Sequence, residues 1–111
     1  MVSSFDFTIN GELLSYRYGQ KTKQKKIDIK YWNQLIKSIN LADFDTAPDG
    51  KPVAGLDGVD KIITIRTIQS EHQLLLDYTK LKTGEYDKIM PFLKLLQLKL
   101  NQIGWREEIV Y

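Results

Sequence analysis

The sequence contains no cysteine and only one histidine, His72. Without cysteine the chain cannot form disulfides, thiol nucleophiles, iron–sulfur clusters or thiolate zinc sites. It also lacks a Gly-x-Ser-x-Gly nucleophile elbow and a phosphate loop ending in Gly-Lys-Ser/Thr. We therefore expect a protein that is not an enzyme, with no cofactor and no metal site.

Long apolar runs are missing as well, since no stretch of about 18 consecutive apolar residues occurs to span a membrane. The first residues, Met1-Val2-Ser3-Ser4, have neither the basic start nor the apolar stretch of a signal peptide. We expect a soluble protein without membrane insertion, either cytoplasmic or a mature exported domain whose signal has been removed.

The residues that are present are those of an ordinary folded domain. Hydrophobic residues make up 42% of the 111 positions and charged residues 27%, as in typical soluble proteins. A chain of this length normally forms one domain and buries roughly two-thirds of its unfolded surface. We predict a single domain over residues 1–111.

Residues 5–18 predict a β-hairpin. Every second residue of its first half is apolar, which is the period of a half-buried strand. Asn10-Gly11 then supplies the residue pair best suited to a type I′ turn, where both central residues need positive φ. A two-residue loop at this point pairs Phe7 with Leu14 and places both on one face.

A second hairpin is predicted over residues 61–79. With Gln69-Ser70 as its loop, Ile65 pairs with Leu74 on the apolar face. This register places the histidine near the start of the returning strand, opposite residue 67, where we expect a partly buried histidine at the rim of the sheet.

A helix pattern follows each hairpin. Asp28 is a suitable N-cap for a first helix over residues 28–39, and Asn40 suits a left-handed residue that ends it. The second helix is expected over residues 85–103, with Thr83 as its cap.

Proline and glycine refine the limits of the second helix. Pro91 lies too far inside for a straight helix, so the helix either starts near Ile89 or kinks at this point. Gly104 is expected to end it.

Together these patterns predict an α+β fold, with an antiparallel sheet of four to five strands and two helices packed on one face. The order is hairpin, helix, loop, hairpin, helix, and whether residues 22–27 and 105–111 form strands is left open. The expected core is Phe5, Phe7, Ile9, Leu14, Tyr16, Trp32, Leu35, Ile36, Ile39, Ile63, Ile65, Leu74, Leu76, Leu93, Leu96 and Leu100.

The long connection over residues 42–60 is acidic and rich in turn-forming residues. Asp45, Asp49 and Gly50 are spaced like part of a calcium-binding loop. Ala47 stands at the third ligand position and no glutamate stands at the twelfth. We therefore interpret these aspartates as turn formers.

Charge is unevenly distributed, although the net charge is only +2. Residues 17–30 carry a net charge of +5, whereas residues 43–60 carry −4. We expect contacts with a partner on these segments and on the exposed face of the sheet. The candidate residues are Arg17, Lys21, Lys23, Lys25, Lys26, Lys30, Arg66, Gln73, Asp49 and Asp57.

These observations favour a non-catalytic module that binds another protein or a small ligand, for example an accessory or inhibitor-like domain of the cell envelope. The alternative is a nucleic-acid-binding domain that uses the basic segment 17–30, with affinity that falls steeply with salt. A third hypothesis, an enzyme that uses His72, requires an acidic partner and a pocket beside the histidine.

Overall fold

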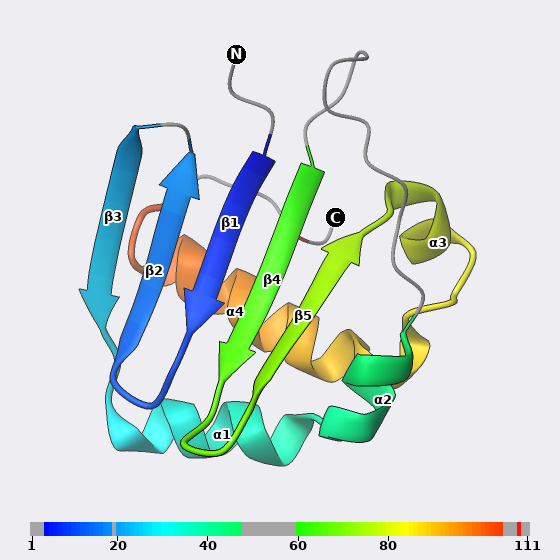
Figure 1. Cartoon of the computed structure of the whole chain (residues 1–111), viewed down its shortest axis with the longest axis horizontal. Helices are drawn as coiled ribbons and strands as arrows, with labels where there is room; N and C mark the ends of the chain where they lie inside the picture. The colour runs from blue at the N-terminus through cyan, green and yellow to red at the C-terminus, as the bar shows by residue number, and fades with distance from the viewer. Residues whose placement is uncertain (1–3, 19, 48–59, 106–108, 110–111) are drawn as a thin grey trace.

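The computed structural model describes residues 4–18, 20–47, 60–105 and 109 (Figure 1). Five strands form one sheet: β1 (Ser4–Ile9), β2 (Leu13–Tyr18), β3 (Lys21–Lys26), β4 (Asp60–Arg66) and β5 (Glu71–Leu76). The helical elements are α1 (Ile29–Ser38), α2 (Leu41–Thr46), α3 (Tyr78–Lys82), the 3₁₀ turn η1 (Asp87–Ile89) and α4 (Met90–Gln102). The expected α+β class is confirmed, and residues 21–26 do form a third strand.

The strands lie in the order β3-β2-β1-β4-β5. Neighbouring strands are antiparallel except β1 and β4, which run parallel. The parallel pair follows from the connection. Two hairpin reversals bring β3 parallel to β1, and the chain then crosses beneath the sheet through α1 and α2 before β4 begins. The sheet is therefore mixed, although it is mostly antiparallel.

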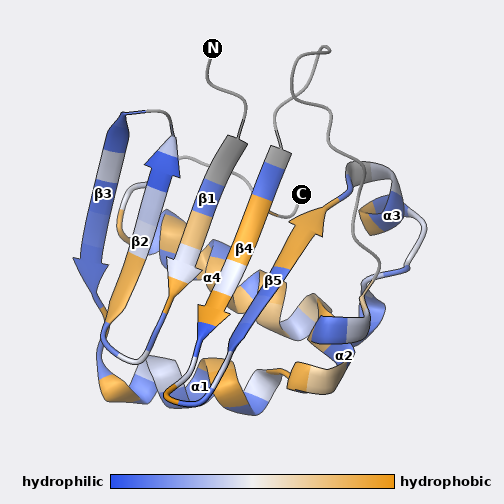
Figure 2. Cartoon of the chain, in the orientation of Figure 1, coloured by the Kyte–Doolittle hydropathy of each residue, from blue (hydrophilic) through white to orange (hydrophobic). Residues whose placement is uncertain are grey.

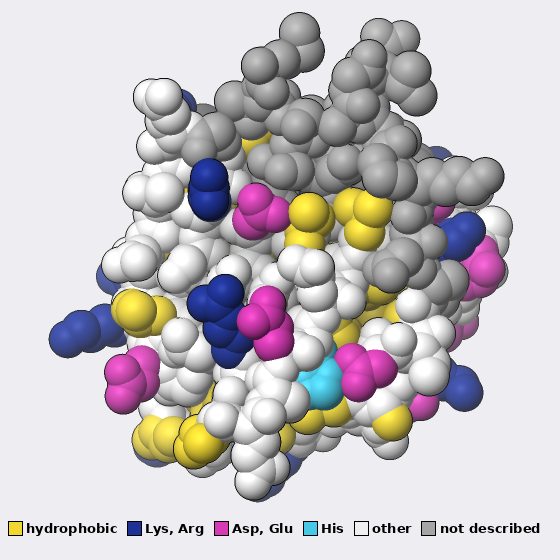
Figure 3. All heavy atoms as spheres, viewed as in Figure 1, with side chains coloured by type: hydrophobic (Ala, Val, Ile, Leu, Met, Phe, Trp, Pro, Cys, Tyr) yellow, Lys and Arg dark blue, Asp and Glu magenta, His cyan; other side chains and the backbone are white. Residues whose placement is uncertain are grey.

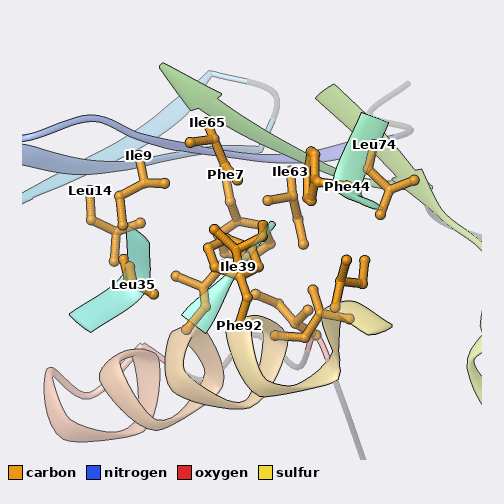
Figure 4. Close-up of a cluster of buried hydrophobic side chains, with 14 of the residues drawn as sticks. Phe7, Ile9, Leu14, Leu35, Ile39, Phe44, Ile63, Ile65, Leu74 and Phe92 are labelled. Atoms are coloured by element: carbon orange, nitrogen blue, oxygen red, sulfur yellow. The ribbon is translucent and has the colours of Figure 1, made fainter. Parts of the chain in front are cut away.

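The described elements form two layers, with α1 and α4 on one face of the sheet and no described helix on the other face (Figure 1). Apolar side chains of the sheet point toward Leu35, Ile39 and Phe92 on the helices (Figure 4). The edge strand β3 is hydrophilic along most of its length, whereas β4 is largely hydrophobic (Figure 2). The core thus lies between the central strands and the helices.

Most of the expected core is confirmed. The predicted residues that are buried are Phe7, Ile9, Leu14, Tyr16, Leu35, Ile39, Ile63, Ile65, Leu74, Leu93, Leu96 and Leu100. Trp32, Ile36 and Leu76 are only partly buried, and the side chain of Phe5 lies outside the described part of the structure. The core also contains Ile27, Tyr31, Phe44, Tyr86, Ile89, Phe92 and Ile109.

The predicted register of the first hairpin is wrong by two residues. Phe7 pairs with Tyr16, and the turn is centred on Gly11 and Glu12. Gly11 does not have positive φ, so the turn is not type I′. Instead, the Asn10 side chain accepts hydrogen bonds from the backbone N–H groups of the next turn residues, at 2.9 Å each. A shift of two residues keeps every side chain on its predicted face.

The second hairpin differs in the same way. Ile63 pairs with Leu74 and Ile65 pairs with His72, so the histidine lies opposite Ile65 rather than Thr67. The Thr67 hydroxyl accepts the backbone N–H of Ser70 at 3.0 Å, and the turn closes around Ile68 and Gln69. The turn thus lies one residue closer to the N-terminus than predicted, which shifts the register by two residues.

The cap at Asp28 is confirmed, since its carboxylate accepts the backbone N–H of Tyr31 at 2.8 Å. The prediction for Asn40 is wrong, because its φ is −97° and it begins α2 rather than ending α1 in a left-handed conformation. Its side chain accepts hydrogen bonds from the first turn of α2. The N-cap preference of asparagine therefore prevails over its preference for a helix end.

The second helix starts at Met90, which agrees with the limit set by Pro91. The predicted cap at Thr83 is wrong, because Thr83 ends α3. This short helix begins after Asp77, whose carboxylate accepts hydrogen bonds from the backbone N–H groups of Thr79 and Lys80. The strand β5 therefore ends at Leu76 and does not extend to residue 79 as predicted.

Gly104 ends α4 as expected, with φ of 79°. The backbone N–H of Trp105 then donates to the carbonyl of Leu100. In the tail, Ile109 is buried and is not part of a strand. Its backbone N–H donates a hydrogen bond to the Gln97 side chain. The rest of the tail lies outside the described residues.

Candidate functional site

An apolar groove lies at one end of the sheet and is lined by residues of α1 and of the β1–β2 and β4–β5 turns. Figure 1 shows α1 and these two turns at the same end of the molecule. Its volume is about 860 Å³, within the range of ligand-binding clefts. We call it the end groove, and its lining residues are Asn10, Gly11, Glu12, Ile29, Trp32, Ile36, Leu41, Arg66, Thr67, Ile68 and Gln69.

The end groove gathers exposed apolar side chains. Among the described residues, the large apolar side chains that are exposed are Ile29, Ile68 and Leu98, and the first two line this groove. Ile29 is 64% exposed on α1, and Ile68 is fully exposed at the tip of the β4–β5 turn. Because exposed apolar residues that cluster mark binding surfaces more often than scattered ones do, this end of the sheet is a candidate interface.

Trp32 of α1 lines the end groove beside the β1–β2 turn. It is partly buried, packs against the core and lies with its indole Nε1 3.7 Å from the position that a Cβ at Gly11 would take. Within the described part of the chain the indole N–H has no acceptor. The groove therefore offers a hydrogen-bond donor beside its apolar wall.

Next to the end groove, three side chains form a hydrogen-bonded chain. His72 Nδ1 lies 2.6 Å from Asp45 Oδ1, and His72 Nε2 lies 2.8 Å from Ser70 Oγ. We call this the Ser70–His72–Asp45 chain. In Figure 3 the histidine, in cyan, lies at the margin of the sheet beside an acidic side chain.

Three separate elements hold this chain of residues together. Asp45 comes from α2, His72 from β5 and Ser70 from the turn that precedes β5. The side chain of His72 is 12% exposed, while that of Asp45 is 49% exposed. The partly buried ring of the histidine is thus hydrogen-bonded on both sides, while the serine is exposed at the surface.

The hydrogen bonds of this chain are donated in one order, from the Ser70 hydroxyl to His72 and from His72 to the Asp45 carboxylate. An ionised carboxylate can only accept, so the proton of neutral His72 lies on Nδ1 and points to Asp45. His72 Nε2 is then an acceptor for the Ser70 hydroxyl. The Thr67 hydroxyl lies 3.0 Å from Ser70 Oγ and can donate to it. Every hydroxyl and imidazole proton in this arrangement has an acceptor.

The end groove and the Ser70–His72–Asp45 chain share two elements. Leu41 lines the groove and Asp45 contacts the histidine, and these residues are four apart on α2, hence on one face of that helix. Thr67 lines the groove and also contacts the Ser70 hydroxyl. The Ser70 and His72 side chains therefore lie at the border of the apolar surface.

The sequence pattern indicates His72 but neither of its partners. Asp45 has the pattern of a turn former, because no sequence signal considered above predicts the cap at Asn40 or the helix after it. Ser70 belongs to a predicted loop. The signal that could have found them is the polar cap at Asn40, which makes α2 a helix and directs Asp45 toward β5.

Four of the candidate partner-binding residues, Arg17, Lys26, Arg66 and Gln73, lie on the open face of the sheet. Arg17, Arg66 and Gln73 line a shallow hollow of about 340 Å³ on this face. Arg66 is paired with Glu71 at 3.4 Å, and Gln73 donates to the hydroxyl of Thr64 at 3.3 Å. Figure 3 shows these mixed charges across the middle of the sheet.

The basic segment, by contrast, does not present a single face. Lys21, Lys23 and Lys25 pair with residues of β2 that belong to the helix-covered side, whereas Lys26 lies on the open side with Arg17. Lys23 Nζ lies 5.3 Å from the ring centre of Tyr16. The remaining candidate, Lys30, lies on α1.

The calcium hypothesis concerns residues largely outside the described part of the structure. Asp49, Gly50 and Asp57 lie there, while Asp45 is engaged with His72. In residues 4–18, 20–47, 60–105 and 109, no group of three or more histidine or acidic residues is placed to hold a metal ion.

Comparison with known proteins yields no match to a family model, to a curated protein or to a solved structure. Across the described ranges, no helix combines the length and the apolar character needed to cross a membrane.

Proposed function

We propose that this chain is a protein-binding module and that the end groove receives an apolar segment of its partner. The observation that supports the proposal is the clustering of exposed Ile29 and Ile68 around partly buried Trp32. Exposure of apolar side chains to water is unfavourable. Burial against a partner is favourable by about 25 cal/mol per Å² of apolar surface removed from water.

The composition of the groove fits a binding hot spot. Tryptophan is the residue type most enriched among side chains that dominate interface energies, and apolar neighbours that exclude water strengthen its contribution. Trp32 also offers its indole N–H to a carbonyl of the partner. Glu12 and Arg66 on the rim can fix the orientation of the partner through their opposite charges.

Rigid elements position these residues. Ile29, Trp32 and Ile36 project from one helix, and Ile68 is carried by a turn that Thr67 closes with its own hydrogen bonds. Binding therefore requires little ordering of this chain, which lowers its entropic cost.

A random-peptide phage library, selected on the immobilised protein, tests the proposal. We expect apolar peptides that bind the wild type and lose at least about tenfold in affinity for the double variant Ile29→Ser and Ile68→Ser. Leu98→Ser is the matched control, since it removes an exposed apolar side chain away from the groove. Peptides that bind all three proteins equally would overturn the proposal.

Trp32 provides an independent readout. The chain has two tryptophans, and Trp105→Phe leaves Trp32 as the only one. We expect a selected peptide to shift the emission of this variant to shorter wavelength, because its indole becomes shielded from water. An emission spectrum unchanged at saturating peptide would place the binding surface elsewhere.

The nucleic-acid alternative stays a prediction, and the division of its lysines between two faces gives it less support than the groove gives protein binding. Its test is a binding assay with a labelled oligonucleotide at increasing salt. The triple variant Lys23→Ala, Lys25→Ala and Lys26→Ala would abolish such binding if the alternative were correct.

A further inference from the structure

We propose that Ser70 is an activated nucleophile that accepts the acyl group of activated carboxylic esters and the phosphonyl group of fluorophosphonates. His72 is its general base, and Asp45 is the positioning residue that orients the imidazole. The inference does not depend on the protein-binding proposal, since it rests on the Ser70–His72–Asp45 chain rather than on the end groove.

The geometry meets the requirements for serine activation. A serine hydroxyl is a weak nucleophile unless a base accepts its proton within about 2.6–3.2 Å, and the base needs a third group to orient it. Ser70 Oγ and His72 Nε2 are 2.8 Å apart, and His72 Nδ1 is 2.6 Å from Asp45 Oδ1. Nucleophile, base and orienting carboxylate are connected in the order that this chemistry needs.

The surroundings keep the arrangement in place and accessible. His72 lies opposite Ile65 in the sheet with its side chain mostly buried, so the ring is held by packing as well as by hydrogen bonds. Ser70 is exposed on a tight turn, where an ester can approach its oxygen. Asp45 supplies the acidic partner that an enzyme using His72 requires.

The acyl-transfer step balances with groups that are present. The Ser70 oxygen forms a bond to the carbonyl carbon of the ester, and the hydroxyl proton passes to His72 Nε2. The bond between that carbon and the alcohol oxygen then breaks. A basic alcohol leaves with the proton from His72, whereas a weakly basic one leaves as its anion and the proton stays on His72. Water then hydrolyses the acyl-serine by the same route and restores the hydroxyl.

The same turn limits how fast the reaction can proceed. The backbone N–H groups of Gln69 and Ser70 donate to Thr67 Oγ1, so these two donors do not point to a developing oxyanion. Loss of one oxyanion donor costs about 10²–10³ in rate in a serine hydrolase. We therefore expect reaction with activated esters, which have good leaving groups, and an acyl-serine that persists long enough to detect.

The chain carries its own control serine. Ser15 lies on β2, within the open face, and Ser70 lies beside the imidazole. A Ser15→Ala variant therefore removes one hydroxyl without touching the Ser70–His72–Asp45 chain. A chain unfolded in urea keeps all its serines but loses the arrangement, and it serves as the second control.

The experiment treats the full chain with a fluorophosphonate, which displaces fluoride as the Ser70 oxygen bonds to phosphorus and its proton passes to His72. Intact-mass and peptide mass spectrometry then locate the adduct. We expect one adduct on Ser70 in the wild type and in Ser15→Ala, and none in Ser70→Ala or in the unfolded chain. His72→Ala should lower the labelling rate about 10²–10⁴-fold.

Asp45 is tested by a measurement that a purely structural role would leave unchanged. In Asp45→Asn we expect the labelling rate to fall, because an amide can also donate and no longer fixes the imidazole proton on Nδ1, whereas the conservative variant Asp45→Glu should recover part of the rate. Circular dichroism confirms that each variant is folded. A folded wild type without an adduct on Ser70, or an equal labelling rate in folded His72→Ala, would overturn the inference.

Discussion

The two faces of the sheet are built from alternate residues of the same strands, yet they have different roles. On the covered face, Phe7, Ile63 and Leu74 lie in neighbouring strands and pack against the helices (Figure 4). On the open face, polar and charged residues meet water and one another (Figure 3). The candidate sites do not lie at the centre of either face. They lie at the end of the sheet, where turns and helices meet. The buried core and the candidate sites thus lie in different parts of one small domain.

The largest effect is expected on the covered face, from Leu93→Ala on α4. Leu93 is fully buried, so its truncation should lower the free energy of unfolding by about 2–5 kcal/mol through lost burial and the cavity left behind. Urea denaturation followed by circular dichroism measures the change. The matched control is Leu98→Ala on the same helix, where the side chain is exposed and the expected change is within about 0.5 kcal/mol. Equal losses in the two variants would contradict the two-layer description.

A smaller effect on the covered face depends on pH. Burial raises the pKa of Tyr31 above its ordinary value. In the unfolded chain the phenol loses its proton near pH 10, while the folded protein keeps it. Stability is therefore unaffected by this group below about pH 10 and falls as the pH rises further, because the unfolded state binds fewer protons there.

Tyr31→Phe removes the titrating group and should flatten this alkaline loss, with little change in the unfolding free energy at neutral pH. The small neutral effect follows from the weak hydrogen bond of the phenol, which donates to the Leu95 carbonyl at 3.4 Å. Urea unfolding of both proteins at neutral pH and above about pH 10 makes the comparison. The same alkaline slope in both would show that Tyr31 does not govern it.

The assignment of residues to the two faces could be predicted from sequence, although both hairpin registers were wrong. Each register is shifted by two residues, and side chains alternate with a period of two, so Phe7, Leu14, Ile63 and Leu74 keep their faces. The shifts have a local cause that pattern alone does not show. In both turns a side chain, Asn10 or Thr67, binds the backbone of the turn and fixes where it closes.

The candidate sites could not be predicted, because they bring together residues from distant segments. The end groove combines Ile29 and Trp32 with Ile68, and the Ser70–His72–Asp45 chain joins residues 27 positions apart. Each segment looks ordinary by itself. The parallel pairing of β1 with β4 places the two turns at the same end of the sheet, and nothing in the local patterns indicates that pairing.

The smallest effect is expected on the open face, from the ion pair between Arg66 and Glu71. These residues are paired across β4 and β5, with their charged atoms 3.4 Å apart and both side chains more than half exposed. Exposed pairs contribute about 0–1 kcal/mol, and salt screens them. A double-mutant cycle with Arg66→Ala and Glu71→Ala should give a coupling energy of at most about 0.5 kcal/mol in urea denaturation at physiological salt.

This small coupling sharpens the contrast between the faces, because Arg66 also lines the end groove. Arg66→Ala should leave the fold intact while it weakens a groove-bound peptide that carries an acidic residue. Neutral peptides should bind the variant as they bind the wild type, which makes them the control. A coupling energy above about 1 kcal/mol would instead mean that the open face helps to hold the sheet together. In that case a loss of peptide binding in Arg66→Ala would not separate a lost contact from a loosened sheet.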